Sequence, residues 1–198
     1  MPRFFSKCYQ FYKVMKDKSY QKLLEYYHGT YQQTIRYEKI PKTLWGECKS
    51  LLSECSHIKD HIYVGNSLNA CDKEMLQTNK IRYILNVTQE ISNYFESEPS
   101  IHYLQIPILD NNDARIIHHI DKVLSFIKEA KDAGSNILIH CYMGSSRSAT
   151  CALLYLMKQY GMTFENAYQY SKKKRACINI SQTFAQQLRY FEENIDSY

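Results

Sequence analysis

Hydrophobic and polar positions follow two periods in residues 58–198. Short runs rich in β-branched and aromatic residues predict strands at 61–65, 81–88, 101–108 and 137–139. Apolar residues spaced three or four positions apart predict helices at 69–79, 116–130, 148–160, 163–174 and 181–194. Because strands alternate with helices, we expect an α/β fold: a central mixed, mostly parallel sheet of about five strands, flanked by helices on both faces.

The first part of the chain has a different pattern. Residues 1–57 are rich in Tyr, Lys and Gln and contain no β-branched run typical of a strand. Spaced apolar residues over 15–27 predict one face of a helix. We therefore divide the chain into a helical N-terminal extension, 1–57, and a main domain, 58–198. The extension is expected to pack on the main domain or on a second chain, which leaves oligomerisation through it open.

The composition is that of one globular domain with an appendage. The chain has 198 residues, of which 44% are hydrophobic and 23% charged, as is typical of folded proteins. Its net charge of +5 is compatible with an anionic substrate. No long Lys/Arg run is present, so nucleic acid is not expected as a partner. The densest basic stretch, Lys172 to Arg175, is interpreted as a solvated helix end.

Cysteine usage and the absence of long apolar runs indicate the compartment. The seven cysteines include no CxxC pair, and His118 and His119 have no third ligand at a suitable spacing, so no metal or other cofactor is expected. An odd number of cysteines without a recognisable secretory signal predicts free thiols in a reducing compartment, the cytoplasm, with the nucleus as an alternative. No apolar run approaches the roughly 20 residues of a membrane span.

The segment after the last predicted strand carries the informative residues. An apolar run, Ile137-Leu-Ile, ends in His140-Cys141, and after five further residues Arg147 opens a predicted helix. A turn of this kind directs successive backbone N–H groups inward, and the helix N-terminus adds positive partial charge. Arg147 is then able to close over a phosphate with two hydrogen bonds. Together these features predict an anion site.

Cys141 is the candidate nucleophile of this site. A thiol in a positive field ionises readily, and a thiolate beneath a bound phosphate is placed for in-line attack on phosphorus. The alternative is that Cys141 is a buried structural thiol and Arg147 a surface residue at a helix start. The coincidence of strand, His-Cys, Gly144, Arg147 and helix in one short segment favours the catalytic interpretation.

The stretch HCYMGSSRS at 140–148 resembles the His-Cys-x5-Arg-Ser/Thr signature of the protein tyrosine phosphatase superfamily, specifically its dual-specificity branch. The resemblance runs from residue 58 to about 194 through IYVGNSLNA, YILNVTQEISNYF and YLQIPILDNN, and is strongest toward slingshot-type and MAP kinase phosphatase domains. Two departures lie outside the loop and concern the neighbouring surface. Arg175-Ala176 stands where the family often has Arg-Pro, and ISQTF at 180–184 where it has Pro-Asn-x-Gly-Phe.

The resemblance implies roles for further residues. Asp110 matches the general acid that protonates the leaving oxygen, with Asp113 as the alternative. Ser148 matches the hydroxyl that assists breakdown of the phosphocysteine. His140 is expected to orient the loop by hydrogen bonding rather than to act as a base. The residues expected to bind phosphate are Tyr142, Met143, Gly144, Ser145, Ser146 and Arg147.

The implied function is that of a dual-specificity protein phosphatase, which hydrolyses phosphotyrosine and phosphoserine/phosphothreonine through a phosphocysteine intermediate. The implied partner is a phosphorylated protein, with a MAP kinase or an actin regulator indicated by resemblance alone. Alternatives are a catalytically weak phosphoprotein-binding module, a phosphatase of a non-protein phosphate ester, and a rhodanese- or arsenate-reductase-like enzyme. Intact Cys141, Arg147 and Asp110 argue against the first, a loop without basic residues over 142–146 against the second, and the YILNVT and IPILD surroundings against the third.

Two further cysteines are candidates for redox protection. A thiolate with a low pKa is easily oxidised. A second thiol makes the damage reversible if it forms a disulfide with the sulfenic acid. Cys71 and Cys151 are the candidates, and a bridge requires Cα atoms within about 7 Å. The simpler interpretation of both is a small buried hydrophobic side chain.

Overall fold

The structure, a computed structural model, describes residues 53–198. Residues 1–52 lie outside the described part, so the helical extension expected over 1–57, and its role in oligomerisation, stay predictions. The described residues cover the whole of the predicted main domain and five residues before it.

Five strands form one sheet with the order β1-β2-β5-β3-β4. β1 is antiparallel to β2, and the other neighbours are parallel. The predicted mixed, mostly parallel sheet is therefore confirmed. The strands are β1 (Ser56–Lys59), β2 (Ile62–Gly65), β3 (Ile81–Asn86), β4 (His102–Gln105) and β5 (Asn136–His140).

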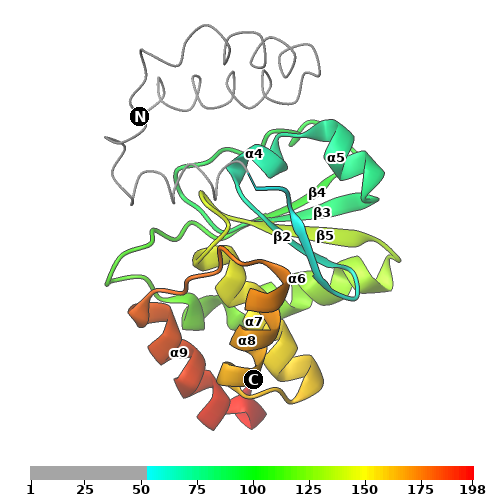
Figure 1. Ribbon diagram of the computed structural model, residues 1–198. Coiled ribbons are helices and arrows are strands. Elements are labelled where there is room, and N and C mark those ends of the chain that lie inside the picture. The colour runs from blue at the N-terminus through cyan, green and yellow to red at the C-terminus, as the bar shows by residue number, and fades with distance from the viewer. Residues whose placement is uncertain (1–52) are drawn as a thin grey trace, which may run out of the picture. The chain divides into compact units, whose positions relative to one another are not determined.

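Helices cover both faces of this sheet, as predicted from the alternation of strands and helices. α4 and α5 lie on one face, and α6 to α9 lie on the other (Figure 1). The helices are α4 (Ser67–Ala70), α5 (Lys73–Thr78), α6 (Ile120–Asp132), α7 (Arg147–Tyr160), α8 (Phe164–Lys174) and α9 (Gln182–Glu193), with short 3-10 turns η2 (Ile116–His119) and η3 (Ile195–Ser197). None of these helices is long and apolar enough to cross a membrane.

The two faces of β5 bury its side chains in two cores. Ile137 and Ile139 pack into the larger core, on the side of α6 to α9. Leu138 points to the other face and packs with Ala70 of α4 and Leu76 of α5. A strand that is buried on both faces has no side chains that face solvent. This explains the continuous apolar sequence of β5.

Helix α7 is the most deeply buried of the helices α6 to α9. Every side chain from Arg147 to Met157 is buried. The helix ends at Gly161, whose φ of 60° lies in the left-handed region that glycine adopts at low cost. Because α7 is fixed on all sides by the core, its first turn is a rigid support for whatever it contacts.

Two local features differ from the sequence expectation. The helix expected over 69–79 is two short helices, because Asp72 has an extended backbone and its side chain caps α5 by accepting a hydrogen bond from Met75 N. The strand β1 was not expected, because Ile58 is the one buried apolar residue in it. A short edge strand with one inward residue has no detectable alternation.

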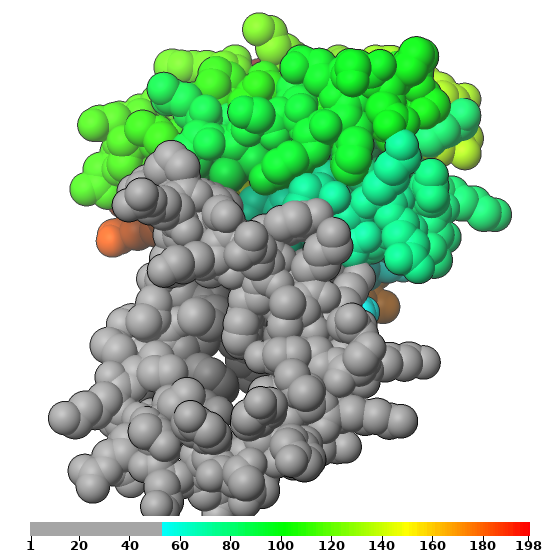
Figure 2. All heavy atoms as spheres, turned by 90° about the horizontal axis from the view of Figure 1, so that it is seen from above, coloured from blue at the N-terminus to red at the C-terminus, as the bar shows by residue number. Residues whose placement is uncertain are grey.

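The sheet register brings four chain segments to one edge. Gly65 of β2 and Asn86 of β3 both pair with His140 of β5, and Gln105 of β4 pairs with Asn86. Because these four strands are parallel, the connections that follow them all leave at the same edge. The connection after β3 (residues 87–101) lies at the surface on the α4–α5 side, where it is teal to green in Figure 2.

Candidate active site

A six-residue loop, 141–146, joins β5 to α7 at this edge. Four of its carbonyl oxygens accept hydrogen bonds from outside the loop. The pairs are Tyr142 O with Ser67 N (3.1 Å), Gly144 O with Arg175 Nε (2.8 Å), Ser145 O with Asn179 N (2.9 Å) and Ser146 O with Thr150 N (2.9 Å). With carbonyls turned outward, the loop has the arrangement of an anion-binding nest, in which the N–H groups face the centre.

Gly144 is required by the geometry of this loop. Its φ is 69°, a conformation that L side chains rarely adopt. A Cβ there would lie 2.4 Å from Gly65 O and 2.6 Å from Arg175 Nη2. Any larger residue would therefore displace the loop from the end of β2.

The sulfur of Cys141 lies inside the loop. Cys141 is only 2% exposed. Gly144 N donates to Sγ at 3.2 Å, and the hydroxyl of Ser148 lies 3.3 Å from Sγ. Ser148 is in the first turn of α7, whose positive N-terminal end faces the same region. A thiolate at this position would accept hydrogen bonds from Gly144 N and from the Ser148 hydroxyl.

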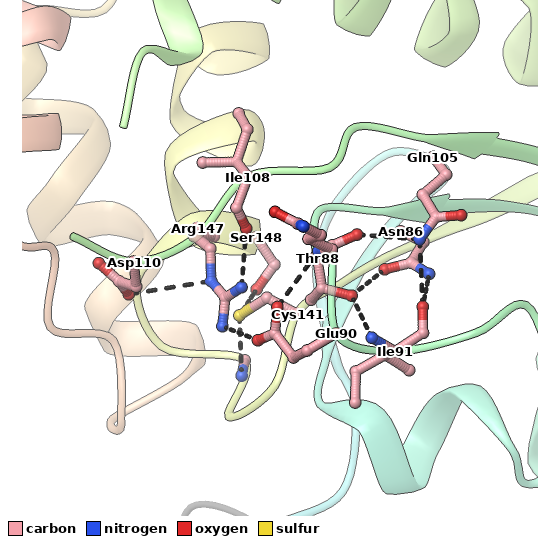
Figure 3. Close-up of polar contacts among 12 residues, drawn as sticks. Asn86, Thr88, Glu90, Ile91, Gln105, Ile108, Asp110, Cys141, Arg147 and Ser148 are labelled. Carbon is pink, nitrogen blue, oxygen red and sulfur yellow. Dashed lines mark hydrogen bonds and ion pairs between the residues drawn. The ribbon is translucent and has the colours of Figure 1, made fainter. Parts of the chain in front are cut away.

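Arg147 extends over the loop and contacts three groups (Figure 3). Its Nη2 lies 2.7 Å from Oε1 of Glu90, its Nη1 donates to Ile108 O at 2.9 Å, and its Nε is 4.0 Å from Oδ2 of Asp110. Burial lowers the pKa of Arg147, but the hydrogen bond to Glu90 and the surrounding charges raise it above its ordinary value. Nε is buried and has no hydrogen-bond acceptor within the described residues.

Glu90 was not selected from the sequence, yet its carboxylate is the anion nearest to Arg147. It lies in the connection after β3, and its side chain is 31% exposed. Burial raises the pKa of Glu90, but the hydrogen bond from Arg147 outweighs it and holds the pKa below its ordinary value. Glu90 is therefore ionised at neutral pH and fixes one side of the guanidinium.

A hydrogen-bond network fixes the turn that carries Glu90 (Figure 3). Thr88 Oγ1 donates to Asn86 Oδ1 at 2.7 Å and accepts from Ile91 N at 3.2 Å. The amide groups of Asn86 and Gln105 both donate to Ile91 O, at 2.8 and 3.2 Å. Since Asn86 and Gln105 sit on the paired strands β3 and β4, the sheet itself positions Glu90.

Asp110 lies beside the loop, at the end of the segment that follows β4. Its side chain is 33% exposed and turns toward Arg147 (Figure 3). The preceding backbone is anchored by the bond between Ile108 O and Arg147. The carboxyl thus borders both solvent and the anion site, which is where a general acid would exchange its proton.

Asp113 is placed differently. It is exposed, and its backbone N–H donates to Asn111 Oδ1 at 3.1 Å in a local turn. Within residues 53–198, no ion pair joins Asp113 to Arg147, whereas Asp110 forms one. This geometry favours Asp110 over Asp113.

His140 is buried beneath the loop. Burial lowers its pKa to about 4, opposed by a backbone hydrogen bond at Cys141 and assisted by the charge of Arg147. The imidazole is therefore neutral at pH 7. This state agrees with an orienting role and leaves little capacity to take up a proton during a reaction.

The remaining residues of the loop differ in their exposure to solvent. Tyr142, Met143 and Ser145 are partly exposed, whereas Gly144 and Ser146 are buried. The Ser146 hydroxyl accepts a hydrogen bond from Ser181 N at 3.3 Å, which ties the loop to the start of α9. The loop is thus open on one side and braced on the other.

One sequence interpretation is wrong at Arg175. The stretch Lys172 to Arg175 was expected to be a solvated helix end, but Arg175 is only 2% exposed. It turns inward because its guanidinium finds backbone and hydroxyl acceptors behind the loop, including Gly144 O. Lys173 and Lys174 are exposed, as expected.

The two cysteines proposed for redox protection lie in unlike surroundings. Cys151 is fully buried in α7, and burial raises the pKa of its thiol. Cys71 is partly exposed, its thiol donates to Leu68 O at 3.2 Å, and burial raises its pKa to about 11. Both thiols are therefore protonated at pH 7, and their role as resolving thiols stays a prediction.

The sheet, the loop and its side chains define an α/β protein with a thiol-based phosphate site. The family model "Dual specificity phosphatase, catalytic domain" matches residues 62–194. The chain therefore belongs to the dual specificity phosphatase family.

Similar proteins support this assignment. Protein phosphatase Slingshot of Drosophila melanogaster is 37% identical over 140 residues, which are 71% of this chain and 13% of that protein. Dual specificity protein phosphatase Mpk3 of the same species is 37% identical over 134 residues, covering 68% of this chain and 33% of Mpk3. The crystal structure of DUSP15 has a TM-score of 0.67 and 29% identity, covering 70% of this chain and 87% of DUSP15. The chain thus spans less than two thirds of the two curated relatives.

Proposed function

We propose that this chain hydrolyses phosphate monoesters on proteins, with Cys141 as nucleophile. The observation that carries the proposal is the buried Cys141 sulfur, which lies 3.2 Å from Gly144 N and 3.3 Å from the Ser148 hydroxyl, inside a loop covered by Arg147. Membership of the dual specificity phosphatase family supports the same chemistry.

In the first step, the thiolate of Cys141 attacks phosphorus. A sulfur–phosphorus bond forms, the phosphorus–oxygen bond to the substrate side chain breaks, and Asp110 transfers its proton to the leaving oxygen. Loop N–H groups and Arg147 Nε stabilise the negative charge on the other phosphate oxygens. The products of this step are the dephosphorylated side chain and a phosphocysteine.

In the second step, water hydrolyses the phosphocysteine. The Asp110 carboxylate takes a proton from the attacking water, the sulfur–phosphorus bond breaks, and inorganic phosphate leaves. Sulfur then regains its negative charge. The Ser148 hydroxyl, 3.3 Å from Sγ, is placed to donate a hydrogen bond to that departing thiolate.

We infer that the substrates are phosphotyrosine and phosphoserine or phosphothreonine in proteins. The absence of Lys and Arg from loop positions 142–146 favours a protein substrate over the more highly charged phosphoinositides. A MAP kinase or an actin regulator stays a prediction from resemblance. We also propose the cytoplasm as the compartment, because reduced thiols such as Cys141 persist there.

A substrate panel tests this proposal. Phosphotyrosine peptides, phosphothreonine peptides and a short-chain phosphoinositide are incubated with wild type and with Cys141→Ser, and released phosphate is measured. Wild type should hydrolyse both peptide classes, and Cys141→Ser should hydrolyse none. Phosphopeptide binding without turnover by wild type would instead identify a binding module, and a preference for the lipid would identify a phosphatase of non-protein esters.

A further inference from the structure

The guanidinium of Arg175 lies directly behind the phosphate loop. Arg175 is the residue that follows α8, and it is 2% exposed. Its Nε donates to Gly144 O at 2.8 Å, which links the loop to the end of α8. Its remaining donors bind the segment before β2. They contact Glu54 O at 2.7 Å, Ser53 Oγ at 3.0 Å and Ser56 Oγ at 3.4 Å.

All of these acceptors are neutral. The ion pairs formed within residues 53–198 do not include Arg175. A buried cation without a carboxylate partner is costly unless another negative charge lies near it. A group that can carry a negative charge is therefore expected close to Arg175.

One peptide segment connects Arg175 to the nucleophile. Gly144 accepts from Arg175 through its carbonyl and donates to the Cys141 sulfur through its N–H, at 2.8 and 3.2 Å. The space between them is closed, because a Cβ on Gly144 would meet Arg175 Nη2 at 2.6 Å. Burial lowers the pKa of Arg175, and the thiols of Cys177, Cys141 and Cys55 act in the opposite direction. Thiols, rather than carboxylates, are thus the ionisable groups that act on this cation.

We propose that Arg175 is a positioning residue of the active site: through Gly144 it holds the loop around Cys141, and its positive charge is balanced by the Cys141 thiolate. This rests on the proposed function, in which Cys141 reacts as a thiolate. Arg147 covers the open side of the loop and binds substrate, whereas Arg175 supports the loop from behind without contacting substrate.

The test follows the chemical reactivity of the Cys141 thiol. Iodoacetamide, a neutral reagent, is applied to the full chain over a range of pH, and mass spectrometry follows alkylation of the peptide that contains Cys141. The variants are Arg175→Gln, which keeps a donor but loses the charge, and Arg175→Lys, which keeps the charge. Lys174→Gln is the matched control, since Lys174 is the exposed neighbour and the same charge is removed. Other charged or titratable groups that interact with Cys141, Arg147 or Arg175 are unchanged in every variant: Glu90, Asp110, His140, Cys55, Cys151 and Cys177.

Arg175→Gln should shift the alkylation profile to higher pH by roughly one unit, the effect of removing a nearby cation. Because Arg175→Lys keeps the charge, its alkylation profile should lie close to that of wild type. The profile of Lys174→Gln should match wild type. A folded Arg175→Gln with a wild-type profile would overturn the proposal and leave a scaffold role that changes only thermal stability. Because the readout is alkylation, failure of the wild type to hydrolyse phosphate would count against the proposed function and not against this inference.

If Arg175→Gln does not fold, Arg175→Lys decides the positioning role. A lysine contacts fewer acceptors at once, so it does not hold Gly144 O and the 53–56 segment together as the guanidinium fork does. Its kcat/KM should fall roughly tenfold or more, with kcat the more affected, because a misplaced loop weakens transition-state contacts. A wild-type kcat/KM in folded Arg175→Lys would overturn the proposal.

Discussion

Glu90 and Asp110 approach the same guanidinium, but at distances that separate their roles. Glu90 lies 2.7 Å from Arg147 Nη2 and has a lowered pKa, so it remains a carboxylate. Asp110 forms a longer ion pair, at 4.0 Å from Nε, and its side chain is 33% exposed to solvent. One carboxyl is therefore suited to position a cation, and the other to carry a proton.

The first prediction concerns the acid. Asp110→Asn should slow hydrolysis of phosphotyrosine or phosphothreonine peptides by roughly 10²–10⁴-fold, because an alkoxide or phenoxide leaves poorly without a proton. Hydrolysis of activated aryl phosphates should slow much less, because their aryloxide groups leave more easily without a proton. Steady-state kinetics on both substrate types measures the difference. Asp113→Asn is the matched control, and a larger loss there than in Asp110→Asn would reassign the acid.

The second prediction concerns the anchor of Arg147. Glu90→Ala should raise the inhibition constant of inorganic phosphate and lower kcat/KM by roughly tenfold or more, because the guanidinium loses its fixed orientation. Glu90→Gln keeps an acceptor for Nη2 and should recover part of the loss. Glu96→Gln, in the same connection but away from Arg147, is the control. Tighter phosphate binding by Glu90→Ala would mean that Glu90 competes with substrate instead of positioning Arg147.

The third prediction concerns pH and His140. The folded protein holds this imidazole neutral down to about pH 4, whereas the unfolded chain protonates it near its ordinary pKa of roughly 6.5. Between these values the unfolded state binds more protons, so the free energy of unfolding should fall as pH decreases, by at most about 1.4 kcal/mol per pH unit from this group. The free energy of unfolding, measured with urea at several pH values from 7 to 4, should depend less steeply on pH in His140→Asn than in wild type. An equal pH dependence in both proteins would contradict the buried neutral state.

At the scale of elements, the sequence predicted what is local and missed what is brought together by the sheet. The loop 141–146 and the start of α7 are contiguous with β5, so one stretch of sequence carries their geometry. Glu90 reaches Arg147 only because β3 pairs with β5 and a hydrogen-bond network fixes the turn after β3. Arg175 reaches Gly144 from the far end of α8. The run VTQEI contained a signal, a charged residue just after a buried strand, but its partner was not identifiable without the register.

The same reasoning explains which elements were predicted. β5 and most of α7 were predicted because they are buried over most of their length, which gives conspicuous apolar runs. β1 has one buried residue and was missed, and a single cap at Asp72 divided a predicted helix into α4 and α5. Short elements that depend on a cap or an edge pairing leave little periodic pattern in the sequence.

The fourth prediction concerns β1 and the residues before it. Ser56 of β1 pairs with Val64 of β2, and Ser53 and Glu54 supply acceptors to buried Arg175. A chain that begins at Ser53 should therefore be more stable than one that begins at Ile58. The shorter chain loses several hydrogen bonds, each contributing about 1 kcal/mol, so its free energy of unfolding should fall by at least about 2 kcal/mol. Equal urea midpoints would instead place the domain boundary at 57, as the sequence pattern predicts.

At the scale of the whole described unit, the fold concentrates one kind of chemistry at one edge. Four parallel strands end there, and the segments after them supply Glu90, Asp110, Cys141 and a glycine-bearing loop. Helix α7 directs its N-terminal end at the same point, and Arg175 closes the loop from behind. The central claim is that this edge transfers a phosphoryl group to Cys141.

The most direct test of that claim is to trap the intermediate. Wild type is mixed with a phosphotyrosine peptide, quenched in acid within the first turnover, digested, and the peptide that contains Cys141 is examined by mass spectrometry for a phosphate adduct. We predict an adduct on Cys141 in wild type and none in Cys141→Ser, which should remain folded and inactive. Hydrolysis without an adduct, or an active Cys141→Ser, would contradict the account.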